Sequence, residues 1–102
     1  MKYSHDYKKL NNMVYTTIRR YKKAKIGDKI METYPSGKHL AFVVAESRFT
    51  LDELPLSLLQ NDTDIEEWED IFKLFQSFYP KPIDIYKDKF YVYVLCKERL
   101  IF

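Results

Sequence analysis

The residues most suited to chemistry gather in one basic segment, Met13 to Ile30 (MVYTTIRRYKKAKIGDKI). Its basic residues are Arg19, Arg20, Lys22, Lys23, Lys25 and Lys29. Its one acidic residue is Asp28. Its hydroxyl and phenol groups belong to Tyr15, Thr16, Thr17 and Tyr21. A guanidinium binds phosphate or a base edge through its planar fork, and an ammonium binds phosphate as a compact charge. The segment therefore indicates a site for an anionic ligand.

Two roles are open to each arginine and to Thr17. Arg19 or Arg20 either faces a ligand cleft or forms a buried strut that bonds to carbonyl groups or to a carboxylate from the second half of the chain. Thr17 either hydrogen-bonds a ligand or caps the turn that follows it. Residue type alone does not separate these roles.

The lysines and tyrosines of the segment also have two readings. Lys22, Lys23 and Lys25 suit contacts to a nucleic-acid backbone that do not depend on base sequence, or they form an ordinary solvated face. Tyr15 and Tyr21 are of the type that stacks on bases in single-strand binders. In a chain with nine tyrosines, packing in the core or on the surface is the commoner role.

Charge is divided unevenly along the chain. Residues 1–50 carry eleven Lys/Arg against four Asp/Glu, a net charge of +7, and residues 51–102 carry six against eleven, a net charge of −5. A basic half raises the local concentration of phosphate groups and suits a nucleic-acid partner. The alternative is a surface dipole that only keeps the protein soluble.

Composition indicates one globular domain over residues 1–102, with 46% hydrophobic and 17% aromatic residues. We expect no membrane segment, because no run of about 18 apolar residues occurs. The N-terminal residues lack the apolar stretch of a signal peptide. The single cysteine, Cys96, excludes an internal disulfide and fits a reducing compartment, so we expect a cytoplasmic protein.

The remaining polar residues do not indicate a cofactor or a metal. His5 and His39 have no partner at ligand spacing, which argues against a zinc site. Six acidic residues between Asp62 and Asp70 are typical of a solvated helix face that complements the helix dipole. Cys96 alternates with valines, which favours a small buried hydrophobe over a nucleophile.

Strands and turns are predicted in both halves. Val14 to Ile18 is β-branched and reads as extended, or as the lead into a tight helical turn through Arg19–Lys23. A turn follows at Gly27-Asp28. Strands over Lys29–Tyr34 and His39–Glu46 form a hairpin around Pro35–Lys38. In the second half, the predicted strands are Ile83–Tyr86, Phe90–Cys96 and Leu100–Phe102, with a bulge at Lys97-Glu98.

Helices are predicted between these strands and at the start of the chain. Residues 1–12 form a short helix or arm. Thr50 to Glu53 fits a capping box, and because Pro55 follows, the element is either two short turns or a helix that begins near Pro55. A second capping signature, Thr63 to Glu66, opens the clearest helix, which ends at Tyr79-Pro80. Its apolar stripe is Ile65, Trp68, Ile71, Phe72, Phe75 and Phe78, with Trp68 assigned to the core.

The order of elements predicts an α+β fold, in which a curved, mostly antiparallel sheet forms a small barrel around one well-formed amphipathic helix. The order of motifs also resembles the ASCH domain, a member of the PUA-like superfamily. Thr17–Arg19 resembles the Thr-x-Arg end of its Gly-x-Lys-x-x-Thr-x-Arg signature, and Lys25–Asp28 its Gly-Asp turn. Phe49–Pro55 resembles the loop and short helix after its first hairpin, and Phe90–Phe102 its last barrel strands.

The resemblance spans the chain from about Val14 onward and implies a function. PUA-like proteins bind RNA or modified nucleotides in a cleft beside the barrel, which implies an RNA or nucleotide-like ligand at Thr17 and Arg19. Some ASCH-like enzymes are amidohydrolases acting on an acetylated cytidine, and others are reported as ribonucleases. This chain has Asn12 and Val14 at the Gly and Lys positions of the signature, so the resemblance favours binding over catalysis.

Three functions follow as expectations. The first is an RNA- or nucleotide-binding module that uses the basic Thr-x-Arg cleft. The second is an enzyme on RNA or modified nucleosides, with candidate groups at Thr17, Lys25, Glu32 and Glu46. The third is a structural or interaction protein, for example a homodimer, that pairs through its oppositely charged halves.

Overall fold

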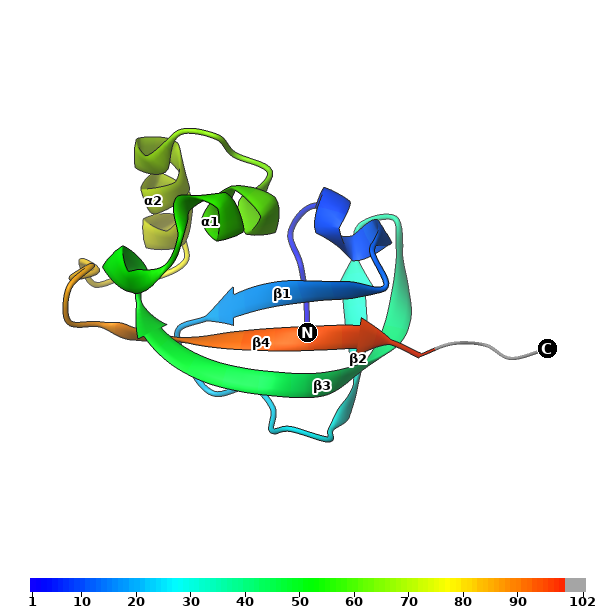
Figure 1. The fold of residues 1–102 in the computed structure, drawn as a ribbon. Coiled ribbons are helices and arrows are strands. Elements are labelled where there is room, and N and C mark those ends of the chain that lie inside the picture. Colours follow the sequence, from blue (N-terminus) through cyan, green and yellow to red (C-terminus); the bar gives the residue numbers. More distant parts are fainter. Residues whose placement is uncertain (99–102) are drawn as a thin grey trace.

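In the computed structural model, which describes residues 1–98, the chain forms a curved antiparallel sheet and two α-helices (Figure 1). The strands are β1 (Val14–Arg19), β2 (Lys29–Tyr34), β3 (Gly37–Thr50) and β4 (Lys89–Lys97). The helices are η1 (Lys8–Asn11), η2 (Leu51–Glu53), α1 (Leu56–Thr63) and α2 (Trp68–Ser77), of which η1 and η2 are 3₁₀ turns. The sheet has the order β1-β4-β3-β2 and curls into a half-barrel, which confirms the predicted α+β class.

The first hairpin confirms the prediction from turn chemistry. β2 and β3 pair from Lys29↔Phe42 to Tyr34↔Gly37, around a turn at Pro35 and Ser36. β3 then continues beyond the predicted end and pairs with β4 up to Thr50. Because one strand serves two partners in this way, β3 can curl the sheet, as Figure 1 shows.

The sheet's irregularity lies in β3. The register shifts between Val43 and Ala45, so that Val44 bulges out of the ladder. A bulge bends its strand and increases the local twist, which suits the curl of β3. The bulge predicted at Lys97-Glu98 is wrong, because Lys97 pairs regularly with Ala41 and β4 ends there.

The two faces of the sheet bury two separate cores, because successive side chains of a strand point to opposite faces. The first core takes Ile18 from β1 and packs α1 and α2 against the sheet; its buried members are Ile18, Leu51, Leu54, Leu59, Ile71, Phe75, Ile83, Phe90 and Val92. The second takes Tyr15 from β1 and lies inside the curl; its buried members are Tyr3, Leu10, Tyr15, Ala24, Ala41, Val43, Tyr93 and Leu95.

The N-terminal residues and the β1–β2 connection contain little regular structure. Residues 1–12 contain only η1 and an isolated bridge between Lys2 and Thr33. The helical turn predicted over Arg19–Lys23 is wrong, because β1 extends to Arg19 and the backbone beyond it is irregular. The Gly27 turn is confirmed: Gly27 has φ 93°, and the Asp28 carboxylate accepts the Lys25 N–H at 3.0 Å.

The capping box at Thr50 is confirmed, and the one at Thr63 is wrong. The Thr50 N–H donates to Glu53 Oε1 at 3.0 Å at the start of η2, and α1 begins directly after Pro55. Thr63 instead ends α1, where its hydroxyl donates to the Leu59 carbonyl at 2.7 Å. Asp64 then adopts φ 61°, which stops the helix, and α2 begins only at Trp68.

Three further predictions fall in the second half. The strand predicted over Ile83–Tyr86 is wrong, because the Asp84 carboxylate accepts the Tyr86 N–H at 2.9 Å and folds the segment into a turn. Trp68 and Cys96 are half-buried, and Trp68 packs against the first core. The strand predicted over residues 100–102 lies outside the described residues. Among residues 1–98, no helix is both long and apolar enough to cross a membrane.

The leucines of α1 provide a matched test of the first core. Leu59 is 1% exposed and Leu56, one turn earlier, is 47% exposed. We expect Leu59→Ala to lower the free energy of unfolding by about 2–5 kcal/mol, because it leaves a cavity between α1 and the sheet. Leu56→Ala should cost less than about 1 kcal/mol. Urea denaturation of both variants measures the difference, and equal losses would contradict this packing.

Candidate functional site

A cleft of about 470 Å³ opens beside β1, which is an edge strand of the sheet. One wall comes from the N-terminal segment, the second from the end of β1 and the residues after it, and the third from the ends of α1 and α2. Its lining residues are Met1, Lys2, Tyr3, Ser4, Tyr7, Lys9, Ile18, Arg19, Arg20, Tyr21, Lys23, Asp62, Thr63, Leu74, Phe75, Phe78 and Tyr79. This volume lies within the range of roughly 300–1,000 Å³ that is typical of small-molecule sites.

Arg19 presents its guanidinium to this cleft. The group lies over the Tyr3 ring, with Cζ 4.9 Å from the ring centroid. It also donates to the carbonyls of Ile18 at 3.1 Å and Lys2 at 3.4 Å. Among residues 1–98, no carboxylate forms an ion pair with Arg19. Arg19 is therefore positioned by its neighbours and still carries an uncompensated charge.

Arg20 has a structural role: it bonds to a carbonyl group and a carboxylate from the second half of the chain. It donates to the Lys89 carbonyl and forms an ion pair with Asp88, with 3.3 Å between Nη2 and Oδ1. Its guanidinium also lies 5.5 Å from the centre of the Phe90 ring. Arg20 is therefore a strut between the end of β1 and the start of β4, although it also lines the cleft.

The lysines that follow are exposed, and only Lys23 of Lys22, Lys23 and Lys25 lines the cleft. The Lys23 N–H donates to the Tyr93 hydroxyl at 2.9 Å, which fixes the backbone and leaves the ammonium free to reach outward. Lys22 approaches Glu46 at 4.0 Å. Lys2 also lines the cleft and is exposed.

Thr17 and Tyr15 belong to the interior and not to the cleft. Thr17 is 0% exposed, and its hydroxyl has no hydrogen-bond partner in the described part of the chain. Tyr15 is 3% exposed and lies in the second core, so it cannot serve as an open stacking platform. Tyr21, at 62% exposure, is the tyrosine of the pair that lies at the cleft, edge to face with Tyr79.

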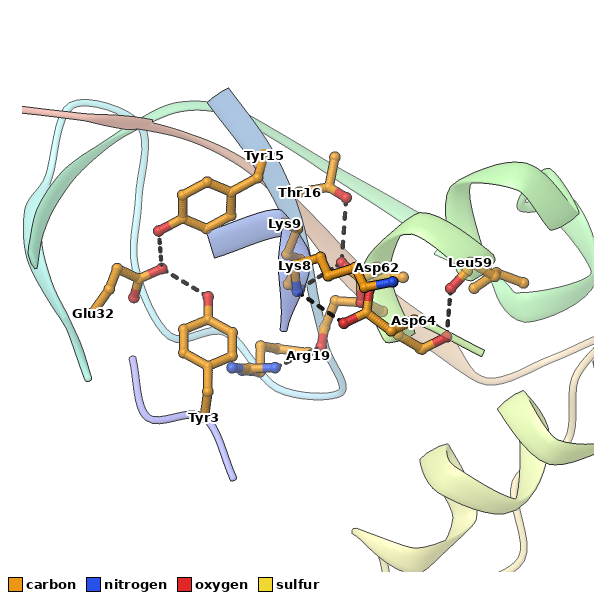
Figure 2. Close-up of polar contacts among 12 residues, drawn as sticks. Tyr3, Lys8, Lys9, Tyr15, Thr16, Arg19, Glu32, Leu59, Asp62 and Asp64 are labelled. Atoms are coloured by element: carbon orange, nitrogen blue, oxygen red, sulfur yellow. Dashed lines mark hydrogen bonds and ion pairs between the residues drawn. The ribbon is translucent and has the colours of Figure 1, made fainter. Parts of the chain in front are cut away.

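Inside the curl, the carboxylate of Glu32 is the centre of a buried polar network. Glu32 is 0% exposed, and its Oε1 accepts hydrogen bonds from Tyr3 at 2.7 Å and Tyr15 at 2.9 Å (Figure 2). Its Oε2 lies 2.6 Å from the Met1 amino group. Burial, reinforced by the charge of Glu32, raises the pKa of both tyrosine hydroxyls, so they stay protonated as donors.

His39 extends this network toward the surface. Its Nε2 lies 2.6 Å from the Tyr15 hydroxyl and its Nδ1 lies 3.0 Å from the Tyr34 hydroxyl. Burial lowers the pKa of His39 below its usual 6.5, and the charge of Lys97 lowers it further. Glu32, Tyr15 and His39 therefore form one connected chain of hydrogen bonds.

A second polar network, with a buried and an exposed hydrogen bond, joins η1 to the end of α1 (Figure 2). Lys9 Nζ donates to Asp62 Oδ1 at 2.7 Å, and both residues line the cleft. Burial lowers the pKa of Lys9, and the charge of Asp62 opposes that shift. The Lys8 N–H donates to Asp64 Oδ2 at 2.8 Å, so two bonds hold η1 against α1.

The four groups considered for catalysis have different surroundings in the structure. Thr17 and Glu32 are buried, Lys25 is exposed and Glu46 lies near Lys22. Within residues 1–98, no hydrogen bond joins any two of Thr17, Lys25, Glu32 and Glu46. The same described residues contain no cluster of three or more His, Cys, Asp or Glu that could hold a metal ion.

The importance of Lys9, Asp62 and Glu32 did not emerge from the sequence. For Glu32 a signal exists, since it shares a face of its strand with Ile30 and Tyr34, and a charge on an inward face needs a partner. Lys9 and Asp62 lie 53 residues apart and carry no local pattern.

The Lys9–Asp62 pair provides a test of the second network. We expect Lys9→Met to lower the free energy of unfolding by about 3–5 kcal/mol, because it leaves a buried carboxylate without its cation. The double variant Lys9→Met/Asp62→Leu should recover most of this loss. Lys8→Met is the control, because Lys8 contributes only its backbone N–H. Chemical denaturation measures all three, and no recovery in the double variant would contradict the pairing.

His39 gives the protein a pH dependence of known sign. Its folded-state pKa is lowered, so between that value and 6.5 the unfolded chain binds the proton more readily. Stability should therefore fall as the pH drops below about 6.5. Thermal melting across this range should show a shallower decline for His39→Gln than for the native chain. His5→Gln, at an exposed position, should keep the native slope; identical slopes for all three would exclude His39 as the source.

Comparison with known proteins gives a family relationship but no function. No family model matches the chain. No solved structure matches it. An uncharacterised protein of Methanocaldococcus jannaschii is 32% identical over 88 residues, which cover 76% of this chain and 77% of that protein. The chain therefore belongs to the same protein family as this Methanocaldococcus jannaschii protein.

Proposed function

We propose that the chain binds RNA or a nucleotide-like ligand in the cleft beside β1, with Arg19 as the main phosphate contact. The observation that carries this proposal is the Arg19 guanidinium, which is held over the Tyr3 ring at the cleft and forms no ion pair with a carboxylate of residues 1–98. A guanidinium held in this way has lost part of its freedom before binding, so less entropy is lost when it grips a phosphate.

The other residues of the cleft support the same ligand class. Lys2 and Lys23 add two exposed ammonium groups that suit a phosphate backbone. The aromatic residues of the lining are Tyr3, Tyr7, Tyr21, Phe75, Phe78 and Tyr79. Phe78 and Tyr21 are 50% and 62% exposed, so their rings are open to stacking by a base. Cations and open aromatic rings together are typical of single-strand recognition.

The resemblance to the ASCH domain supports the same class of ligand. Arg19 of the Thr-x-Arg motif lines the cleft, whereas Thr17 is buried behind it. Lys25–Asp28 forms the turn that enters the β2–β3 hairpin. We propose that the chain is a small PUA-like domain of this type, in which Arg19 faces the ligand and Thr17 supports the strand.

Binding of a short single-stranded RNA, measured by fluorescence anisotropy, tests the proposal. The native chain should bind at low salt, and log K should fall with log[salt] by about 0.7 for each phosphate contacted. Arg19→Ala should weaken binding by at least about tenfold, because a hydrogen bond to a charged group contributes about 1.5–3 kcal/mol. It should also reduce the salt slope.

Two variants serve as controls for this experiment. Arg48→Ala removes an exposed arginine of β3 that does not line the cleft, and it should bind like the native chain. Arg19→Lys keeps the charge without the planar fork, and it should fall between the native chain and Arg19→Ala. If the native chain does not bind RNA or mononucleotides at low salt, the proposal is wrong.

A further inference from the structure

The cleft contains a polar pair that phosphate binding does not use. Lys9 and Asp62 are 2% and 6% exposed, come from η1 and α1, and both line the cleft. Charged residues at such low exposure are normally satisfied by their surroundings. Within residues 1–98, the Lys9 ammonium donates one hydrogen bond, to Asp62, and it lies 5.3 Å and 5.6 Å from the ring centres of Tyr3 and Tyr7.

The carboxylate of Asp62 keeps one oxygen unused. Its Oδ1 accepts hydrogen bonds from Lys9 Nζ at 2.7 Å and from the Thr16 hydroxyl at 3.3 Å. Within residues 1–98, no hydrogen bond reaches its Oδ2. An ionised carboxylate has about four acceptor positions. In the described part of the chain, the fully buried side-chain atom without a hydrogen-bond partner is Thr17 Oγ1 and not Asp62 Oδ2, so Oδ2 keeps some contact with solvent. Because Asp62 lines the cleft, a ligand there can donate to Oδ2 in place of water.

The charge of the pair decides which kind of donor fits. Lys9 already balances the charge of Asp62, so a further cation would add an unbalanced charge to a buried site. A phosphate beside Asp62 would place two anions together. A neutral N–H group has neither cost. The phosphate of a ligand therefore belongs at Arg19, and an uncharged hydrogen-bonding edge belongs at Asp62.

We infer that Asp62 recognises the base of the nucleotide, by accepting a hydrogen bond at Oδ2 from the exocyclic amino group of cytosine or adenine. Carboxylates accept from the cytosine amino group in this way in nucleic-acid complexes. The ring nitrogen beside that amino group is an acceptor, and the Lys9 ammonium has two further N–H groups to offer it. This inference rests on the proposed function, because it assumes that a nucleotide occupies the cleft.

Uracil and hypoxanthine are the discriminating comparisons. Each carries a carbonyl oxygen where cytosine or adenine carries the amino group, so in the same pose an acceptor would face the Asp62 carboxylate. Lys9 holds the carboxylate in place, and the Lys9 ammonium lies 5.3 Å and 5.6 Å from the centres of the Tyr3 and Tyr7 rings. Because Lys9 and Asp62 are only 2% and 6% exposed, little water is left at the pair to compensate for a mismatched base.

Calorimetric titration of the native chain with two matched pairs of nucleotides tests the inference. CMP should bind about 5- to 150-fold more tightly than UMP, and AMP more tightly than IMP by a similar factor, which is the discrimination that one good bidentate contact to a base edge provides. Ribose 5-phosphate, which has no base, should bind no better than UMP. These measurements need no substitution, so they do not depend on whether a variant folds.

Variants then assign the discrimination to the pair. Asp62→Asn replaces an acceptor by an amide that also donates, so the preference for CMP over UMP should disappear or reverse. Lys9→Met/Asp62→Leu should bind the two nucleotides equally, whereas Arg19→Ala should weaken both by the same factor and keep their ratio. Asp6→Asn, on an exposed residue outside the cleft, should leave the ratio unchanged.

Failure of the inference is distinct from failure of the proposed function. Equal binding of CMP and UMP and of AMP and IMP by the native chain would overturn the reading of Asp62, while binding itself would still support a nucleotide site. A preference that survives Asp62→Asn unchanged would also overturn it. If the native chain binds no nucleotide and no RNA, the proposed function fails and this inference fails with it.

Discussion

The buried carboxylate of Glu32 is the constraint on which the inside of the half-barrel depends. A charge at 0% exposure needs several donors, and the fold brings them from the N-terminal segment and from β1. Tyr3 is one of these donors, and its ring also lies under the Arg19 guanidinium and supports it. The position of the cleft arginine therefore follows from the hydrogen bonds of a carboxylate in the interior.

Local sequence patterns were enough for the parts of the fold that local chemistry decides. The β2–β3 hairpin was predictable because Pro35 sets the turn and alternation sets the faces. The Thr50 capping box was predictable because donor and acceptor lie three residues apart. The start of α2 was not, because the left-handed conformation of Asp64 coincides with a hydrogen bond from Lys8, 56 residues away. Nothing near Thr63 in the sequence reports that contact.

The same division applies to the candidate site. The basic segment is a local signal for an anion site, and the resemblance to the Thr-x-Arg motif favoured Arg19. Residue type alone could not separate Arg19 from Arg20, since the role of Arg20 depends on Asp88 and the Lys89 carbonyl near the other end of the chain. Tyr15 and Tyr21 had the same candidate role in the sequence, although Tyr15 is in the core and Tyr21 lies at the cleft. Burial of Lys9 was equally hidden, because its partner belongs to another element.

The two cores on opposite faces of the sheet have one more consequence. They are separated by the strands, yet the cleft takes Tyr3 from the core inside the curl and Phe75 from the core beneath the helices. A bound ligand would contact both cores at once and link them across the edge of β1. Anything that binds only the folded chain stabilises it, by an amount that rises with the logarithm of its concentration once this exceeds Kd. In this molecule that stabilisation would join the helical layer and the half-barrel into a more cooperative unit.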